Sequence, residues 1–331
     1  MTKHHSMSRR TALMAMGGLA AAPAVAASLA AIPRPLAAAA PMQGPARPPF
    51  YRFMLGEFEV TTLLDGYFAV DDLHSIFGQD QPAETVRELA RENFLPEAEL
   101  LNPFTPVLVN TGEKLVLFDT GNGPARRPMA ANTVDAMRAA GYEPDQVDLI
   151  VLTHLHPDHI GGLMTDGSPT FPNAAYVTGE AEYAFWSHDD RLGGPTENTA
   201  NLVRSNVVPL AERMTFIGDG DDVVTGITAL AAFGHTPGHM AFHLESEGRR
   251  LLLWADAANH YVMSVQRPDW HVRFDMDKEA AALTRKRMMD MANAERIPVT
   301  GYHMPFPAVG FIEKPTPESY RWVQASYQLN L

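Results

Sequence analysis

The spacing of apolar positions along the chain changes between two and about 3.6 residues, which predicts alternating strands and helices. Alternation over residues 51–67, with a Gly-Glu turn near its centre, predicts two paired strands. Helical spacing over 82–94 predicts an amphipathic helix, and the β-branched run over 147–152 predicts a buried strand. The remaining elements follow the same rules: strands at 105–110, 114–118, 174–178, 227–232, 239–244, 250–254 and 299–302, and helices at 133–140, 179–187 and 277–292. Because no long linker interrupts this alternation, we predict one α/β domain over residues 50–331.

The first 39 residues have a different pattern. Residues 8–11 read Ser-Arg-Arg-Thr and precede an alanine-rich apolar stretch, which is typical of a twin-arginine export signal. Residues 37–39 are three alanines, suitable for a signal peptidase, and three prolines disfavour a membrane anchor instead. We therefore expect a signal peptide at 1–39, a Pro-rich linker at 40–49 and a periplasmic or secreted mature protein without a membrane span.

Composition narrows the possible partners. The formal net charge is −13, and the chain contains no cysteine. The acidic balance disfavours nucleic acid and anionic membranes, which leaves a small-molecule substrate as the expected partner. The lack of cysteine excludes disulfides, thiolate metal ligands, a cysteine nucleophile and an iron–sulfur cluster. Three aromatic residues that we expect to be exposed, Tyr51, Phe53 and Phe77, leave a homodimer open.

The strongest chemical signal follows the buried strand that ends at residue 152. Residues 153–162 read Thr-His-Leu-His-Pro-Asp-His-Ile-Gly-Gly, so His154, His156, Asp158 and His159 lie within six positions. The carboxyl end of a strand is where α/β sheets place their sites. Burying so many polar side chains together is costly unless something binds them. Imidazole and carboxylate groups are ligands of zinc and similar divalent metals, so the sequence predicts a metal site here.

Three more ligand-type residues lie at predicted strand ends. His235 is in the turn Gly-His-Thr-Pro-Gly-His, Asp256 ends an apolar strand, and His303 follows another. Since strand ends meet at one edge of a sheet, we expect these side chains to join the first cluster. We expect His239 and His243 to support the site or its strand from outside.

This set of motifs resembles the metallo-β-lactamase superfamily in residue type and order. The resemblance implies a four-layer αββα sandwich and a binuclear centre of two divalent ions, zinc first, with manganese, cobalt or iron as alternatives. It also implies how the residues divide: His154, His156 and His235 at the first ion, Asp158, His159 and His303 at the second, and Asp256 as the bridge.

Within the superfamily, the chain is most similar to the methyl parathion hydrolases, through the stretches 51–60, 109–121 and 319–321, among others. This resemblance implies a hydrolase in which a metal-bridging hydroxide attacks an ester-like bond, such as an organophosphate triester, with Asp158 and Asp256 as catalytic residues. An acyl-homoserine lactonase is the alternative, although such lactonases have tyrosine three residues after the bridging aspartate, where this chain has Asn259. A metal-binding sensor on the same fold is the non-enzyme alternative.

Four residues are expected to line the substrate pocket. Arg126 lies in a loop where methyl parathion hydrolases have an aromatic wall, and Trp186 matches one of their aromatic pocket residues. His260 and Tyr302, with Asp158, are expected to be candidate proton donors to an alkoxide leaving group.

Overall fold

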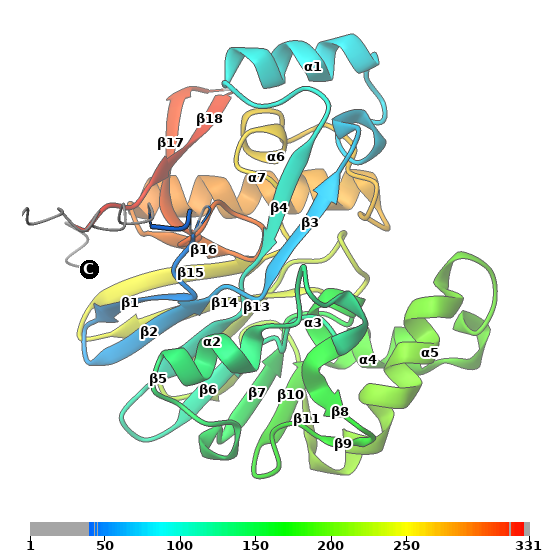
Figure 1. Ribbon diagram of the computed structural model, residues 1–331, viewed down its shortest axis with the longest axis vertical. Coiled ribbons are helices and arrows are strands. Elements are labelled where there is room, and N and C mark those ends of the chain that lie inside the picture. The colour runs from blue at the N-terminus through cyan, green and yellow to red at the C-terminus, as the bar shows by residue number, and fades with distance from the viewer. Residues whose placement is uncertain (1–39, 43, 45, 318, 328–331) are drawn as a thin grey trace, which may run out of the picture. The chain divides into compact units, whose positions relative to one another are not determined.

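The computed structural model describes residues 40–42, 44, 46–317 and 319–327 (Figure 1). The chain divides into two units, 1–46 and 47–331. The described residues of the first unit contain no helix or strand, and the predicted signal peptide at 1–39 lies outside the described residues. Within the described part of the chain, no helix is both long and apolar enough to cross a membrane.

The described strands of the second unit form two seven-stranded sheets and two short ribbons. The first sheet is parallel from β6 to β11, and the second is antiparallel except for the pair β15–β16. In spatial order, the first sheet contains β1 (Phe50–Leu55), β2 (Phe58–Leu63), β5 (Val107–Asn110), β6 (Leu115–Phe118), β7 (Leu149–Leu152), β10 (Ala175–Gly179) and β11 (Met214–Ile217). The second contains β12 (Asp222–Val224), β13 (Ile227–Ala231), β14 (Met240–Ser246), β15 (Arg249–Ala255), β16 (Val299–Gly301), β17 (Val309–Thr316) and β18 (Ser319–Gln324). The ribbons are β3 (Gly66–Val70) with β4 (Leu100–Phe104), and β8 (Met164–Thr165) with β9 (Ser168–Pro169).

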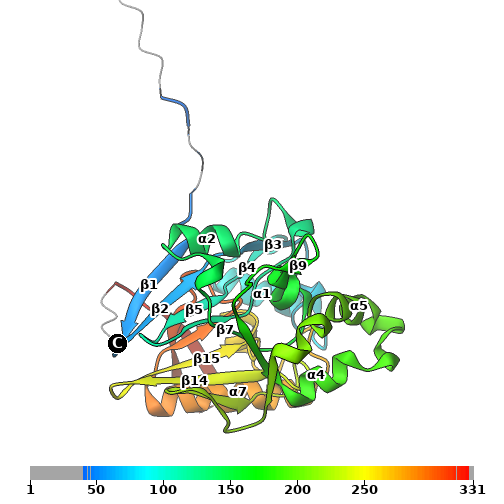
Figure 2. The ribbon, with the colours of Figure 1, turned by 90° about the horizontal axis from the view of Figure 1, so that it is seen from below.

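Helices cover the outer face of each sheet. The described helices are α1 (Ala83–Glu92), α2 (Thr133–Ala139), α3 (Pro157–Ile160), α4 (Glu180–Ser187), α5 (Glu197–Asn206), α6 (Met263–Gln266) and α7 (Lys278–Glu295). Apolar residues of α2, α4 and α5 pack with Leu117 and Ile150 of the first sheet. Met288 and Met289 of α7 pack with Leu252 of the second sheet. Figure 2 shows α2 and α7 on opposite sides of the sheets.

The principal core lies between the two sheets. Val60, Val109 and Val151 of the first sheet are fully buried in one cluster with Phe242 and Leu251 of the second. Alternate residues of the same strands face outward to the helices, which explains why strands such as β7 read as continuous apolar runs. The order helix, sheet, sheet, helix confirms the predicted four-layer αββα sandwich.

The elements predicted from periodicity are present within a few residues of their expected limits. One limit is wrong: the strand expected to continue to residue 67 breaks after Leu63, and β3 begins at Gly66. Gly66 has a φ of +148°, and a Cβ there would collide with the backbone of Met129, so the chain turns out of the sheet. Helices α5 and α6 and strands β4, β8, β9, β11, β12, β17 and β18 were not predicted.

The expected exposure of two aromatic residues is also wrong. Phe53 is buried in the core between the sheets. Phe77 is buried with Leu73, Val86 and Trp270 beneath helix α1. Tyr51 is half-buried. The expectation of a homodimer therefore loses its basis in exposed aromatic side chains.

Candidate metal centre

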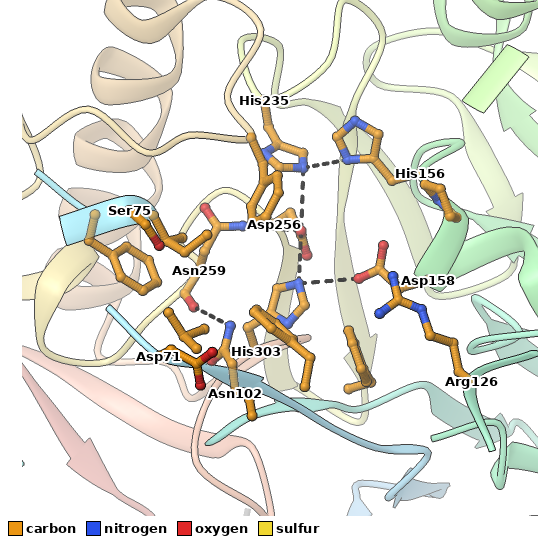
Figure 3. A pocket seen from close by; sticks show the side chains of 18 of the residues that line it. Asp71, Ser75, Asn102, Arg126, His156, Asp158, His235, Asp256, Asn259 and His303 are labelled. Atoms are coloured by element: carbon orange, nitrogen blue, oxygen red, sulfur yellow. Dashed lines mark hydrogen bonds and ion pairs between the residues drawn. The ribbon is translucent and has the colours of Figure 1, made fainter. Parts of the chain in front are cut away.

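The predicted ligands are carried by segments that follow four strands. His154 and His156 lie in the loop after β7, and Asp158 and His159 lie in the single turn of α3. His235 lies between β13 and β14, whereas Asp256 and His303 follow β15 and β16. The fold brings all of these side chains to one site, as Figure 3 shows for His156, Asp158, His235, Asp256 and His303.

Three imidazoles form the first half of this site. His156 Nδ1 lies 3.1 Å from His154 Nε2 and 3.0 Å from His235 Nε2. All three ring nitrogens lie within 4.8 Å of one another. They therefore form a group of the size and chemistry that one metal ion requires.

The second half contains Asp158, His159 and His303. Asp158 Oδ2 lies 3.6 Å from His159 Nε2 and 3.5 Å from His303 Nε2. His159 is fully buried, and the carboxylate of Asp158 is about one-fifth exposed. Each half therefore has one partly exposed member, His156 in the first and Asp158 in the second.

Asp256 lies between the two halves. Its Oδ2 is 3.3 Å from His235 Nε2 and 3.1 Å from His303 Nε2, whereas its Oδ1 is 3.5 Å from His159 Nε2. The amide of Asn259 also donates to Oδ2, at 3.1 Å. One carboxylate thus contacts ligand nitrogens from both halves, which is the arrangement that a bridging ligand needs.

Hydrogen bonds outside the cluster fix which nitrogen faces inward for four of the five ligand histidines. Nδ1 of His159 faces Asp119 Oδ2 at 2.8 Å, and Nδ1 of His303 faces the Pro103 carbonyl at 2.8 Å. These oxygens only accept, so each Nδ1 donates, and Nε2 is the nitrogen that faces the site and carries the lone pair when the ring is neutral. The same reasoning applies to His235, whose Nδ1 faces Asp275 at 2.9 Å. Nδ1 of His154 lies 3.1 Å from the Thr153 hydroxyl, which donates its own proton to Asp119 and therefore accepts from the ring.

Buried polar atoms without a hydrogen-bond partner indicate whether a divalent cation would fit this site. Among the described residues, His159 Nε2 and Asp256 Oδ1 are buried and lack a hydrogen-bond partner. Buried polar atoms of this kind are costly when nothing satisfies them. Because inward lone pairs and carboxylate oxygens surround both atoms, a cation would satisfy them, and the nitrogen and oxygen donors suit zinc and related divalent ions.

The protonation equilibria differ across the site. Burial lowers the pKa of His154 and His156 well below the ordinary histidine value. Burial also opposes protonation of His159, but Asp119, Asp158 and Asp256 around it raise its pKa well above the ordinary value. For Asp256, burial is outweighed by His303 and His159, and its pKa lies well below the usual range. The second half of the site therefore favours positive charge.

Sequence reasoning missed one buried carboxylate that organises both ligand loops. Glu182 of α4 accepts hydrogen bonds from the backbone of Leu155, at 2.9 Å, and of Gly238, also at 2.9 Å. It also accepts from the Trp186 indole at 2.8 Å and the Thr236 hydroxyl at 2.7 Å. Burial raises the pKa of Glu182, although these four donors oppose the shift. Nothing in the local sequence distinguishes it from the exposed Glu180.

The two supporting histidines differ. His239 is fully buried; its Nδ1 lies 3.1 Å from the Ala232 carbonyl, and its Nε2 accepts from the Asp256 amide at 3.1 Å. It therefore fixes the backbone of Asp256. His243 is only partly buried, faces Leu252 in the strand register and lies outside the ligand groups.

A cavity of about 580 Å³ opens beside the ligand cluster (Figure 3). His156, Asp158 and His303 line it on the side of the cluster. Its apolar lining includes Phe68 and Phe104 from the β3–β4 ribbon. The cavity thus combines an apolar wall with the candidate metal ligands, as ligand sites commonly do.

Of the predicted pocket residues, Arg126 lines this cavity. Trp186, His260 and Tyr302 are not among the described residues that line it, because each directs its polar group elsewhere. Trp186 is buried and bonds Glu182, and Tyr302 donates its hydroxyl to the Asp158 carbonyl at 2.5 Å. His260 Nδ1 accepts from two backbone amides near the start of α6, both at 3.1 Å.

Comparisons with known proteins agree with this geometry. A family model described as the metallo-beta-lactamase superfamily matches residues 105–300. An N-acyl homoserine lactonase of Bacillus sp is 29% identical over 164 residues, covering 46% of this chain and 59% of the relative. The lactonase AttM of Agrobacterium fabrum is 28% identical over 132 residues, covering 38% of this chain and 46% of the relative. The chain thus spans about half the length of these curated relatives.

Solved structures match over a greater length. AidC, a dizinc quorum-quenching lactonase solved with the product N-hexanoyl-L-homoserine, has a TM-score of 0.77 and 26% identity, covering 84% of this chain and 98% of its own. The hydrolase AbOPH of the beta lactamase superfamily has a TM-score of 0.79 and 27% identity. The match covers 86% of this chain and 100% of AbOPH.

Proposed function

The chain belongs to the metallo-beta-lactamase superfamily, and from this membership we propose that it is a binuclear metal-dependent hydrolase of lactone or ester bonds. The position of Asp256 carries the proposal, because its two oxygens contact ligand nitrogens of both halves of the site. Two divalent ions bound here would lower the pKa of a water molecule and polarise a carbonyl or phosphoryl oxygen. In this proposal, the ligand set and the bridging role are those expected from the sequence, with zinc as the first candidate.

The protein groups around the ions have separate tasks. Asp256 sets the spacing of the two halves and is itself held by His239 and Asn259. Asp158 is the partly exposed carboxylate at the cavity, so it is placed to transfer a proton to a leaving alkoxide. Tyr302 does not compete for this task, because its hydroxyl donates to the Asp158 carbonyl and holds that residue in place.

Lactones are the first substrate class that we propose. Both lactonases named above act on this class, and AidC is described as a dizinc enzyme. Organophosphate triesters are the second class, because the aromatic wall formed by Phe68 and Phe104 suits an aryl leaving group. An aryl leaving group departs as a phenolate and needs no proton.

A hydrolysis panel tests the proposal. Metal-loaded protein is assayed with an acyl-homoserine lactone, a methyl-substituted organophosphate triester and an aryl ester, each with and without chelator, and its metal content is measured by mass spectrometry. We expect about two ions per chain and the highest chelator-sensitive rate on the lactone. Two bound ions with no turnover of any substrate would overturn the hydrolase proposal and favour the metal-binding sensor.

We also propose that the protein is exported by the twin-arginine route. The support is the Arg9-Arg10 pair and the apolar stretch that follows it. Replacing both arginines with lysine should retain the full-length precursor in the cytoplasm. Cell fractionation measures this, and an unchanged periplasmic or secreted fraction would contradict the proposal.

A further inference from the structure

The loop that carries Arg126 is packed directly against the candidate metal centre. Arg126 ends a short 3-10 turn, Pro124–Arg126, which follows Gly123. Gly123 lies against Gly161, immediately after α3, and a Cβ on Gly161 would collide with the Gly123 amide nitrogen. This close backbone contact places the loop beside the segment that contains Asp158 and His159.

A buried carboxylate holds the same loop from behind. Asp65 is fully buried and accepts hydrogen bonds from the Asn122 backbone, at 3.0 Å, and from its side-chain amide, at 2.8 Å. It also accepts from the Thr133 backbone and hydroxyl, at 2.9 and 2.6 Å. Both ends of the loop are thus fixed to one buried group, so the backbone of Arg126 is pre-positioned.

The side chain of Arg126 is exposed and is unpaired among the residues that the structure describes. It forms no ion pair or hydrogen bond with any described residue, whereas the neighbouring Arg127 pairs with Asp135 at 2.8 Å. Arg126 is also the one arginine or lysine among the described residues that line the cavity. Asp71, which lines it too, lies on the opposite side in Figure 3. The cavity therefore has a free cation on the side of Asp158.

We propose that Arg126 is a specificity-determining residue that binds an anionic oxygen group of the substrate, a carboxylate or a phosphate. A planar guanidinium binds either group through two parallel hydrogen bonds. The inference rests on the proposed hydrolase function and adds a substrate class to it: esters or lactones that carry a negative charge away from the bond that is broken. The apolar wall of Phe68 and Phe104 would contact the uncharged remainder of such a molecule.

Two substrates with the same leaving group test this. Metal-loaded full chain is assayed with 4-nitrophenyl adipate, whose free carboxylate is too far from the ester to close a five-membered anhydride, and with its methyl ester, which is neutral. We expect the wild-type chain to prefer the anionic ester in kcat/KM, and Arg126→Ala to reduce that preference by about tenfold, mainly through KM. Arg126→Glu should favour the neutral ester. Arg127→Ala is the matched control, because Arg127 is adjacent, exposed and paired outside the cavity, and it should retain the wild-type preference.

A binding measurement separates this inference from the proposed function. Succinate and inorganic phosphate are titrated calorimetrically into metal-loaded wild type and Arg126→Ala, and metal content is measured for both. Weaker binding of either anion to Arg126→Ala at equal metal content supports the inference and identifies which anion is preferred. If neither ester is hydrolysed, the lactone and triester of the panel above decide the hydrolase proposal, while the titration still tests Arg126. An unchanged preference and unchanged anion binding in Arg126→Ala would overturn the role of Arg126.

Discussion

His235 donates through Nδ1 to the carboxylate of Asp275, with 2.9 Å between Nδ1 and Oδ1. The other oxygen of Asp275 accepts from Arg285 of α7 at 2.7 Å, and all three side chains are buried. Arg285 also donates to the carbonyl of Ala257, the residue after Asp256, at 2.9 Å. One arginine thus connects two segments that carry candidate metal ligands.

Asp275→Asn should weaken metal binding. The new amide would turn an N–H group toward either His235 or Arg285, both of which are donors, so the inward direction of His235 Nε2 would no longer be fixed. We expect metal affinity to fall by about 10–100-fold, the usual effect of losing such a partner. Competition with a chromogenic chelator measures this. Asp269→Asn is the control, since Asp269 is exposed and pairs with Lys286. Equal metal retention in the two variants would contradict the prediction.

Arg285→Met should act on stability as well. The guanidinium is fully buried, and its removal leaves the Asp275 carboxylate buried with His235 as its one remaining ion-pair partner among the described residues. Breaking a buried ion pair in this way costs about 3–5 kcal/mol of unfolding free energy. Urea denaturation of metal-free protein measures the loss. Arg287→Met, at an exposed position on the same helix, should change stability far less. A variant with the wild-type midpoint would show that the pair contributes no net stability.

Asp256→Ala tests the bridging position. Removing this carboxylate takes one ligand from both halves of the site, so we expect metal content to fall below that of the wild-type chain and the hydrolytic rate to decrease with it. The rate should fall by more than the roughly 10–100-fold expected for a residue outside the ligand set. Mass spectrometry of bound metal and steady-state rates are measured together. His243→Gln is the control, because His243 lies outside the ligand groups. Full activity with both ions bound in Asp256→Ala would exclude the bridging role.

Glu182→Gln should loosen both loops that Glu182 connects. Four donors face its carboxylate, and an amide can accept at only one of its two terminal atoms. At least one buried donor then lacks a partner, which costs about 1–3 kcal/mol of unfolding free energy. Chemical denaturation measures this loss, with the exposed Glu180→Gln on the same helix as its control. Equal stability of the two variants would show that the loops do not depend on this carboxylate.

Local patterns were sufficient for most strands of the two large sheets, for α7 and for the ligand cluster. His154, His156, Asp158 and His159 are neighbours in sequence, so their spacing alone indicated a site. The convergence of His235 on them required only that strand ends meet at one edge. These inferences depended on short-range periodicity and on residue type.

Partners distant in sequence could not be predicted in this way. Asp119 contacts His159 and Asp275 contacts His235, each across 40 residues, and neither aspartate has a local signal. Arg126 lines the cavity as predicted, whereas Trp186, His260 and Tyr302 do not, because the polar atom of each has a partner elsewhere. Trp186 has such a partner in Glu182, and Tyr302 has one in the Asp158 carbonyl.

Gly161→Ala tests how closely the loop of Arg126 must approach the metal centre. Gly161 has φ −64° and ψ −32°, which alanine adopts freely, so the only effect of the substitution is the collision of its Cβ with Gly123 and Asn122. We expect the unfolding free energy to fall by about 1–3 kcal/mol, as it does at other overpacked sites. We also expect weaker metal binding, because Asp158 and His159 lie on the adjacent turn. Gly193→Ala is the matched control. Gly193 has a φ of −150°, and a Cβ there would meet no atom within 4 Å. The unfolding free energy of this variant should stay within about 0.5 kcal/mol of the wild-type value. Thermal unfolding and chelator competition are measured on both variants. If Gly161→Ala matches Gly193→Ala in both, the loop can move without disturbing the centre, and its close packing does not position Arg126.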